Sequence, residues 1–371
     1  MQTDLPTPML AGLTPAQFMR RHWQKKPLLV RQAFADARPP ASLKELAALA
    51  ARDDVESRLV TAFDGQWKFR HGPIARLPAM GKPGWTLLVQ GLDQHLAEAR
   101  RMMDLFRFIP DARLDDFMLS VASDGGGVGP HFDSYDVFLI QLAGSRRWRI
   151  APQKDAVLRD DVPLKIIANF KPEQDHVLEA GDMLYLPPGW AHDGVAVGPG
   201  CMTGSVGFRA PTADGLAAEL LPRLLDDVDG SGKLYADPRQ EASTEPGRVP
   251  PSLLDFARRA VEAAVQRPHA VERALGEALT EPKAQVWFEP GEVLPPGRGA
   301  RLDRRSRMLY DTTHVFLNGE SFRAGGRDAA LMRGLADRRE LSAAEVGRLS
   351  PEARELLDQW TEDGWVQPLE P

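Results

Sequence analysis

The chain has 371 residues, 43% hydrophobic and 26% charged, which is the composition of an ordinary globular protein with room for two or three domains. A net charge of −6, from 46 basic and 52 acidic residues, disfavours general binding to nucleic acid and weakly favours a basic protein partner. The single cysteine, Cys201, excludes an intrachain disulfide and a cysteine-based zinc site, and residues 1–8 show no secretory leader, so we predict a cytoplasmic protein without a membrane segment.

Residues 1 to about 112 are predicted to form a mixed α/β lead-in. Thr14-Pro15 is typical of a helix start, with a threonine N-cap and proline at the first helical position. Ser42 begins a capping-box pattern, and Asp64-Gly65 predicts the turn of a β-hairpin. The expected elements are helices over 14–23, 42–46 and 93–106, and strands over 27–30, 57–61, 67–70 and 85–90.

Residues 113 to 211 predict a small antiparallel barrel, because several short strands are separated by glycine and proline corners. The first strand covers 114–122 and leads into a glycine-rich turn over 125–130. We expect Ala143-Gly144-Ser145-Arg146 to form a hairpin turn between two strands. Those strands cover 136–142 and 147–151, a polar excursion covers 152–176, and the closing strands lie within 176–197 and 201–208.

After Pro211, helical spacing replaces strand alternation. A leucine-rich helix over 215–227 and a proline-containing linker over 230–252 precede an amphipathic helix over 253–265. From about Gln285, a hairpin followed by helices over 328–338 and 343–363 is winged-helix-like. These last helices carry many acidic residues, which disfavours contact with DNA phosphates.

Three residues indicate a metal site: His131, Asp133 and His192. On a strand, His131 and Asp133 would share one face and look into one pocket. His192 follows Pro187-Pro188-Gly189 and would arrive from a distant strand of the same sheet. Two imidazoles and one carboxylate form the facial triad that leaves one side of a non-haem iron(II) open. The alternative for an isolated His-x-Asp is an ordinary surface pair, but the glycine-rich and Pro-Pro-Gly flanks favour a shaped pocket.

Three stretches resemble the JmjC-type cupin oxygenases: His131–Phe138, Gly144–Trp148 and Gly181–His192. Within that group they look most like the bacterial ribosomal-protein arginine hydroxylases, and Phe18–Leu28 and Ser205–Pro211 are similar to them as well. The resemblance implies an α+β, mainly β fold. It comprises a double-stranded β-helix (cupin, JmjC) barrel in residues 1–211, a helical dimerisation region in 212–284, and a winged-helix-like domain in 285–371.

The resemblance also implies the cofactors. His131, Asp133 and His192 would bind iron(II), with 2-oxoglutarate and O2 in the open positions. Arg146 matches the family position for the arginine that pairs with the far carboxylate of 2-oxoglutarate, which suits a guanidinium fork. Strand alternation places Arg146 with Trp148 and opposite Arg147, although Ser145, where the family often has a basic residue, leaves this register open by one position. Ser205 is a second candidate for contact with 2-oxoglutarate, or an ordinary strand serine.

The implied reaction is hydroxylation at Cβ of an arginine on a large-subunit (50S) ribosomal protein by a homodimeric enzyme. Tyr135, Asp124 and Asp136 lie near the rim of the predicted pocket and are candidate substrate contacts, because a carboxylate suits a guanidinium; the alternative for the aspartates is a solvated turn. A histidine hydroxylase or a lysine demethylase of the same fold is an alternative function. Another is a cupin interaction module that binds metal without oxygenase activity.

Overall fold

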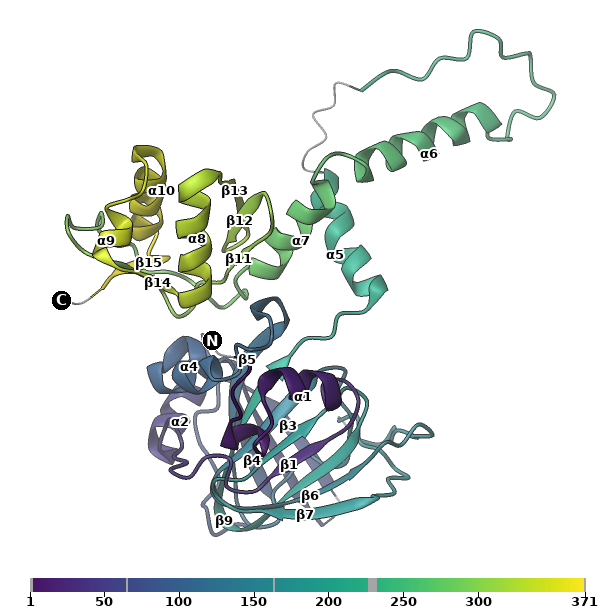
Figure 1. The fold of residues 1–371 in the computed structure, drawn as a ribbon. Helices are drawn as coiled ribbons and strands as arrows, with labels where there is room; N and C mark the ends of the chain where they lie inside the picture. The colour runs from purple at the N-terminus through teal and green to yellow at the C-terminus, as the bar shows by residue number, and fades with distance from the viewer. Residues whose placement is uncertain (1–2, 65, 163, 226–231, 370–371) are drawn as a thin grey trace. The chain divides into compact units, whose positions relative to one another are not determined.

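The computed structural model describes residues 3–64, 66–162, 164–225 and 232–369 (Figure 1). The chain divides into two units, Met1–Ala210 and Pro211–Pro371, and each has its own hydrophobic core. Among the described residues, none of the helices combines the length and the apolar character that crossing a membrane requires.

The first helices of the N-terminal unit begin where the sequence predicts. Thr14 caps α1 (Pro15–Arg21) and Ser42 caps α2 (Leu43–Ala50), and each helix has a complete capping box, which satisfies amide groups that would otherwise lack partners. A 3-10 turn, η1 (Pro8–Leu10), precedes α1. The predicted helix over 93–106 is two short helices, α3 (Leu92–His95) and α4 (Ala97–Asp104), because Leu96 is extended between them.

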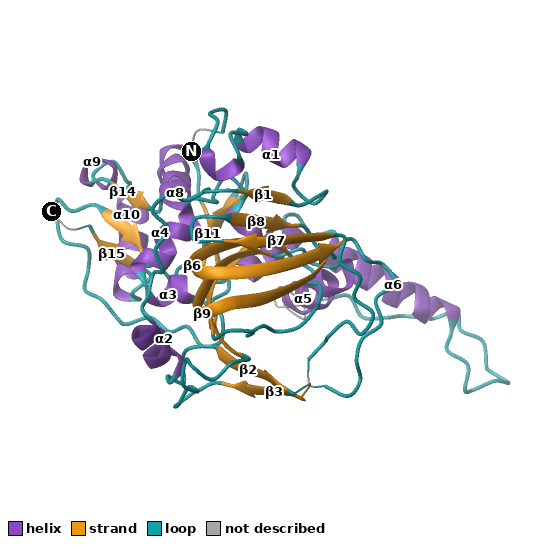
Figure 2. Cartoon of the chain, turned by 90° about the horizontal axis from the view of Figure 1, so that it is seen from below, coloured by secondary structure: helices purple, strands orange, loops and turns teal. Residues whose placement is uncertain are grey.

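One nine-stranded antiparallel sheet forms most of this unit (Figure 2). The strand order is β1-β8-β6-β9-β5-β4-β2-β3, and β7 also pairs with β6. The predicted hairpin is present as β2 and β3, although Gly65 of its turn lies outside the described residues. The 3-10 turn η2 (Asp111–Arg113) leads into β5. The strands are β1 (Leu28–Val30), β2 (Ser57–Phe63), β3 (Gln66–His71), β4 (Trp85–Val89), β5 (Leu114–Ala122), β6 (Asp136–Ala151), β7 (Gln174–Leu178), β8 (Met183–Leu186) and β9 (Ala191–Phe208).

The hairpin predicted at residues 143–146 is wrong, because β6 runs without a turn from Asp136 to Ala151. Gly144 has a φ of +60°, which glycine adopts without the usual cost, and the register with β9 shifts on both sides of Ala143. The glycine therefore marks a bulge within one strand, as glycines in strand interiors often do.

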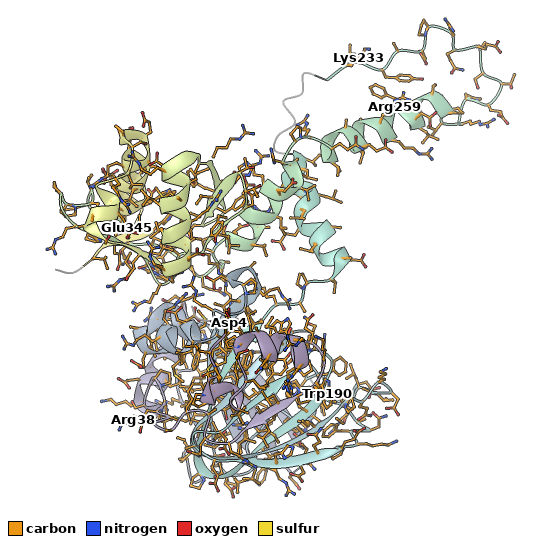
Figure 3. All side chains as sticks on the ribbon, viewed as in Figure 1. Asp4, Arg38, Trp190, Lys233, Arg259 and Glu345 are labelled. Carbon is orange, nitrogen blue, oxygen red and sulfur yellow. The ribbon has the colours of Figure 1, made fainter. Side chains whose placement is uncertain are left out.

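The long strands β6 and β9 link two parts of the sheet. The first half of β6 lies between β8 and the second half of β9, and its second half lies between β7 and the first half of β9. The buried apolar side chains of this unit, drawn with all the others in Figure 3, form a larger and a smaller main cluster. Trp85, Phe117, Phe138 and Phe208 are fully buried in the larger cluster, which also contains Phe18 of α1. The irregularity in β6 lets one strand serve both parts, and the face that they enclose carries the site described below.

The C-terminal unit begins with three helices: α5 (Ala213–Leu225), α6 (Pro251–Val265) and α7 (Ala270–Thr280). The predicted helix over 215–227 and linker over 230–252 extend beyond the described residues at 226–231. Helix α7 packs closely on β12, since a Cβ on Gly276 would lie 2.3 Å from the Phe316 ring. The separate dimerisation region over 212–284 stays a prediction.

The rest of this unit has two small sheets, ordered β14-β10-β15 and β11-β12-β13. The predicted hairpin is present as β11 (Met308–Tyr310) and β12 (His314–Leu317). The helix predicted over 343–363 is two helices, and Ser342 and Ser350 each cap one of them. The remaining elements are β10 (Ala300–Leu302), β13 (Glu320–Arg323), α8 (Gly326–Arg338), β14 (Glu340–Leu341), α9 (Ala343–Val346), α10 (Pro351–Glu362) and β15 (Val366–Pro368).

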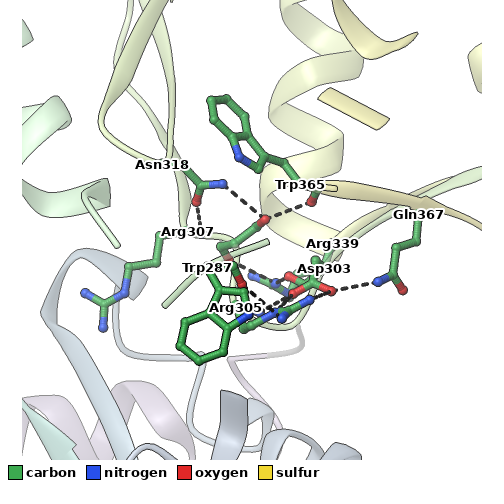
Figure 4. A network of polar contacts seen from close by, with 9 residues as sticks. Trp287, Asp303, Arg305, Arg307, Asn318, Arg339, Trp365 and Gln367 are labelled. Atoms are coloured by element: carbon green, nitrogen blue, oxygen red, sulfur yellow. Dashed lines mark hydrogen bonds and ion pairs between the residues drawn. The ribbon is translucent and has the colours of Figure 1, made fainter. Parts of the chain in front are cut away.

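A polar network ties the strands of the C-terminal unit together (Figure 4). The buried Asp303 carboxylate accepts hydrogen bonds from the Arg305 backbone at 2.9 Å and from Gln367 at 2.7 Å. The Arg339 guanidinium donates to the Asp303 carbonyl oxygen at 2.7 Å. The bonds from Arg305 and Gln367 give the buried carboxylate the partners that it needs.

Candidate active site

His131, Asp133 and His192 come together where β9 begins. Their potential ligand atoms all lie within 4.8 Å of one another. The Asp133 Oδ2 atom is 3.9 Å from His131 Nε2 and 3.6 Å from His192 Nε2. The three side chains therefore surround one point, as the sequence predicts.

The backbone holds this arrangement from two sides. His131 and His192 form an antiparallel bridge, in which each N–H donates to the carbonyl oxygen of the other, at 2.9 and 2.7 Å. The Gly189 N–H donates to the Asp133 carbonyl oxygen at 2.8 Å. The expectation that His131 and Asp133 share a regular strand is wrong, because only His131 makes a bridge and β6 begins at Asp136. The Pro-Pro-Gly turn fixes Asp133 in place of a strand pairing.

Both histidines present the same nitrogen to Asp133. His131 Nδ1 lies 2.9 Å from the Gly129 carbonyl oxygen, and His192 Nδ1 lies 2.9 Å from the Trp190 carbonyl oxygen. A carbonyl oxygen only accepts, so each Nδ1 carries the proton and each Nε2 has a free lone pair. Burial, and next the neighbouring His131, lower the pKa of His192 to about 4. Near neutral pH, His192 is therefore uncharged and ready to bind a metal.

These donors fit an octahedral iron(II) with an open face. Two neutral imidazoles and one carboxylate supply three ligands on one side, and hydrogen bonds at Nδ1 orient both rings. The three ligand atoms are therefore of the kind that the predicted iron(II) ion would bind.

A cavity of about 310 Å³ opens beside the three ligands. On β6, Arg146 and Trp148 both point into it, as strand alternation predicts for residues two apart. The ligands, Tyr135 at the rim and Arg146 all line it. Further lining residues are Arg58, Thr86, Leu88, Gln90, Asp115, Asp116, Met118, Ser120, Val137, Leu139, Trp148, Lys165, Thr203 and Ser205.

Arg146 is the arginine of its strand that faces the cavity. It is 4% exposed, and its Nη1 atom donates to the Gly194 carbonyl oxygen at 3.3 Å. Within the described part of the chain, its Nε and Nη2 atoms have no hydrogen-bond partner. Arg147 and Arg149 instead pair with Asp175 and Asp193. The predicted alternation is therefore present, and a buried cation with unused donors lies beside the cavity, where an anion would satisfy it.

The other predicted site residues divide into two groups. Ser205 and Tyr135 line the cavity, and burial, followed by the adjacent Asp133 carboxylate, raises the pKa of Tyr135. Asp124 lies on an exposed turn and accepts a hydrogen bond from the Gly198 N–H at 2.7 Å.

Asp136 is fully buried outside the cavity lining, against the expectation that it lies at the rim. Its carboxylate accepts hydrogen bonds from Tyr185 at 2.6 Å, Gln24 at 3.0 Å and Arg113 at 3.2 Å. As the first residue of β6 it points to the opposite face from Val137, so it joins the N-terminal segment to the sheet.

Two acidic residues that sequence reasoning missed, Asp115 and Asp116 on β5, line the cavity. Asp115 pairs with Arg209 at 3.0 Å, and Asp116 accepts from the Gly91 N–H at 3.0 Å. For Asp116, its alternation with Met118 and Ser120 along β5 was the available signal, because residues two apart share a face. This alternation does not show by itself which face of β5 points into the cavity. Asp115 lines the cavity where the register of β5 is irregular, between Leu114 and Phe117.

Comparison with known proteins agrees with this geometry. Residues 101–216 match the JmjC domain family and residues 257–367 match the ROXA-like winged helix. The chain is 35% identical over 343 residues to the ribosomal protein uL16 3-hydroxylase of Escherichia coli (strain K12), covering 89% of this chain and 90% of that one. The chain belongs to the ribosomal oxygenase family.

Other members of the ribosomal oxygenase family resemble the whole chain. A probable ribosomal oxygenase of Haemophilus influenzae is 28% identical, over 95% of this chain and 96% of that one. The structure of the E. coli ribosomal oxygenase YcfD in complex with cobalt and 2-oxoglutarate has a TM-score of 0.82 at 31% identity, covering 96% of this chain and 99% of that one. The predicted fold class, a JmjC cupin barrel followed by helices and a winged-helix domain, is confirmed.

Proposed function

We propose that this protein is an iron(II)- and 2-oxoglutarate-dependent hydroxylase acting on Cβ (C3) of an arginine in the large-subunit ribosomal protein uL16. The observation that carries the proposal is one cavity with a three-residue metal site and a buried, incompletely paired Arg146. The E. coli relative carries the name uL16 3-hydroxylase, and the YcfD structure contains cobalt and 2-oxoglutarate. Both support the same cofactors here.

Each part of the cavity has a task in this reaction. His131, Asp133 and His192 would hold the metal, and Arg146 would pair with the far carboxylate of 2-oxoglutarate, with Ser205 as a further polar contact. With O2, the bound metal and 2-oxoglutarate supply the oxidation that turns a C–H bond into C–OH, while 2-oxoglutarate becomes succinate and CO2. The chain itself orients the three ligands and shields the site.

The acidic wall of the cavity suits an arginine substrate. Asp115 and Asp116 face the cavity from β5, and Tyr135 stands at its rim. Carboxylates accept paired hydrogen bonds from a guanidinium fork, while the cavity directs the arginine stem toward the metal ligands. The proposed substrate contacts are therefore Tyr135, Asp115 and Asp116, and Asp124 and Asp136 are left out because neither lines the cavity.

The proposal also covers where and how the enzyme works. A ribosomal protein substrate implies the cytoplasm. The exposed apolar side chains of α6, among them Leu254 and Val261, support a homodimer formed through the helical region, because such faces are usually covered. A net charge of −6 supports recognition of a basic protein and not of nucleic acid.

The test is turnover of 2-oxoglutarate with iron(II) and ascorbate, paired with mass spectrometry of uL16 peptides. We expect a mass gain of one oxygen atom on an arginine peptide. His131→Ala and Arg146→Ala should lose this product, while Arg147→Ala, the matched change on the opposite face of β6, should retain it. The absence of both succinate and oxidised peptide, with metal-loaded protein, would contradict the proposal.

A related activity is the main competitor. Several relatives, such as one of Drosophila persimilis at 26% identity over 50% of this chain, are named as bifunctional lysine-specific demethylases and histidyl-hydroxylases. Oxidation of a histidine peptide in preference to the arginine peptide would favour histidine hydroxylation, and formaldehyde release from a methyl-lysine peptide would favour demethylation. Metal binding without turnover on any of these peptides would favour an interaction module.

A further inference from the structure

Thr86 is a buried threonine whose hydroxyl has no hydrogen-bond partner among the described residues. It lies on β4 and is 1% exposed. A valine would fill this strand position with nearly the same volume and without burying a hydroxyl. An unsatisfied buried hydroxyl costs free energy, so packing alone does not account for the threonine.

The side chain of Thr86 belongs to the wall of the active-site cavity. Thr86, Leu88 and Gln90 alternate along the chain, and all three line the cavity, as expected for one face of a strand. Thr86 pairs with Val60 of β2 and Ala122 of β5, and Val60 lines the cavity as well. The hydroxyl is thus part of the inward face of the sheet.

The glycine turn after β5 places Thr86 at the same end of the cavity as Arg146. A Cβ on Gly126 would lie 3.0 Å from Thr86 Oγ1, and a Cβ on Gly127 would lie 2.6 Å from the Gly194 carbonyl oxygen. That carbonyl oxygen accepts the hydrogen bond from Arg146 Nη1. Gly126 therefore lies against the Thr86 hydroxyl, and the next residue, Gly127, lies against the carbonyl oxygen that binds Arg146.

A second contact ties the turn to Arg146. Ala196 is the residue of β9 directly opposite Arg146, and its N–H donates to the Gly126 carbonyl oxygen at 2.8 Å. The Gly125 N–H donates in turn to the Ala196 carbonyl oxygen at 3.0 Å. Close backbone approach of this kind requires glycine, so the turn brings β4 and the Arg146 segment together.

We propose that Thr86 is a positioning residue for 2-oxoglutarate, and that its hydroxyl donates to the far carboxylate beside Arg146. A carboxylate has two oxygens with about four acceptor sites, so one guanidinium leaves some of them free. The Thr86 hydroxyl and the unused Nε and Nη2 atoms of Arg146 supply donors for them. This inference rests on the proposed function, because it assumes that 2-oxoglutarate occupies the cavity.

The assignment is tested by calorimetry, which measures how two acids bind to the manganese(II)-loaded protein in the absence of turnover. The probes are 2-oxoglutarate and 2-oxovalerate, which keeps the 2-oxo acid and has a methyl group in place of the far carboxylate. The variants are Thr86→Val, which removes only the hydroxyl, and Thr86→Ser, which restores it. Thr61→Val is the matched control, since Thr61 lies on the neighbouring β2 and outside the cavity lining.

We expect Thr86→Val to weaken 2-oxoglutarate binding about tenfold to hundredfold, the usual effect of losing a hydrogen bond to a charged group. Binding of 2-oxovalerate should not change, and Thr86→Ser and Thr61→Val should bind both acids like the parent. In turnover with the peptide, Thr86→Val should raise KM for 2-oxoglutarate and leave kcat near the parental value.

Two results would overturn the assignment. One is parental affinity of Thr86→Val for 2-oxoglutarate, which would mean that the hydroxyl meets only water. The other is equal weakening for both acids, or weak binding by Thr86→Ser, which would indicate a packing role. If the parental protein itself binds no 2-oxoglutarate, the proposed function fails, and that result is distinct from either of these.

Discussion

At the scale of single residues, each key side chain is defined by what its polar atoms meet. Arg146 and Arg147 are neighbours with opposite surroundings: Arg147 pairs with exposed Asp175, while Arg146 is buried beside the cavity with donors unused. Exposed ion pairs contribute little to stability, whereas a buried cation needs a partner. The same side chain is therefore an ordinary surface group at one position and a candidate binding group at the next.

Asp116 offers a prediction on substrate choice. Asp116→Asn keeps the size of the side chain and removes its charge, so we expect KM for an arginine peptide to rise about tenfold or more, as for a lost hydrogen bond to a charged group. The KM for 2-oxoglutarate should stay near the parental value. Asp175→Asn, on exposed β7, is the control. Unchanged peptide KM for Asp116→Asn would show that the guanidinium binds elsewhere.

Asp136 offers a prediction on pH. Burial raises its pKa above the ordinary value of 3.8, against the lowering effect of Tyr185 and its other partners. From about pH 4 up to the raised folded-state pKa, the folded protein therefore holds more protons than the unfolded chain, and stability falls as pH rises. Asp136→Asn should flatten this fall in urea unfolding series. Asp124→Asn, on an exposed turn, serves for comparison, and an unchanged slope in Asp136→Asn would contradict the argument.

At the scale of elements, irregularities in strands position the site. The bulge at Gly144 carries β6 from one part of the sheet to the other, and the bridge between His131 and His192 holds two residues of the candidate metal site together. Close contacts between strands then orient the rings, since Trp148 lies across from Gly194 and 5.8 Å from the His192 ring. A small residue at 194 is what allows this packing.

Gly194→Ala tests that contact. The new Cβ would lie 2.5 Å from the Trp148 ring, which forces the indole to move, and overpacking of a core typically costs about 1–3 kcal/mol. We expect a lower free energy of unfolding and weaker metal binding, measured by urea unfolding and manganese(II) titration. Gly81→Ala, where a Cβ meets nothing within 4 Å, is the matched control. Parental metal affinity in Gly194→Ala would mean that Trp148 does not orient His192.

At the scale of the whole molecule, two units with separate cores share one chain. The cavity is lined by residues of the N-terminal unit, among those described. Helix α6 has no fully buried side chain, and Leu254, Val261 and Val265 are exposed on it. An apolar helix face of this kind favours association with another surface.

The predicted homodimer leads to a direct measurement. Val261→Asp places a charge on the apolar face of α6, and burying an unpaired charge is costly, so the protein should become monomeric in analytical ultracentrifugation. Arg259→Asp, on the same helix (Figure 3) but nearly opposite Val261 at 3.6 residues per turn, should remain dimeric. A parental protein that sediments as a monomer, or a Val261→Asp dimer, would count against dimerisation through this face.

The sequence by itself determined the local features, because these depend on neighbours in the chain. Capping at Thr14 and Ser42, the extent of β5 and the three metal-site residues follow from short patterns. Resemblance to the family supplied the cofactors and Arg146. Tertiary structure decided what depends on distant partners: that Gly144 is a bulge, that Asp136 is buried against Tyr185, and that Asp116 and Thr86 face the cavity. A strand pattern shows which residues share a face, but only packing against the rest of the fold shows which face is inside.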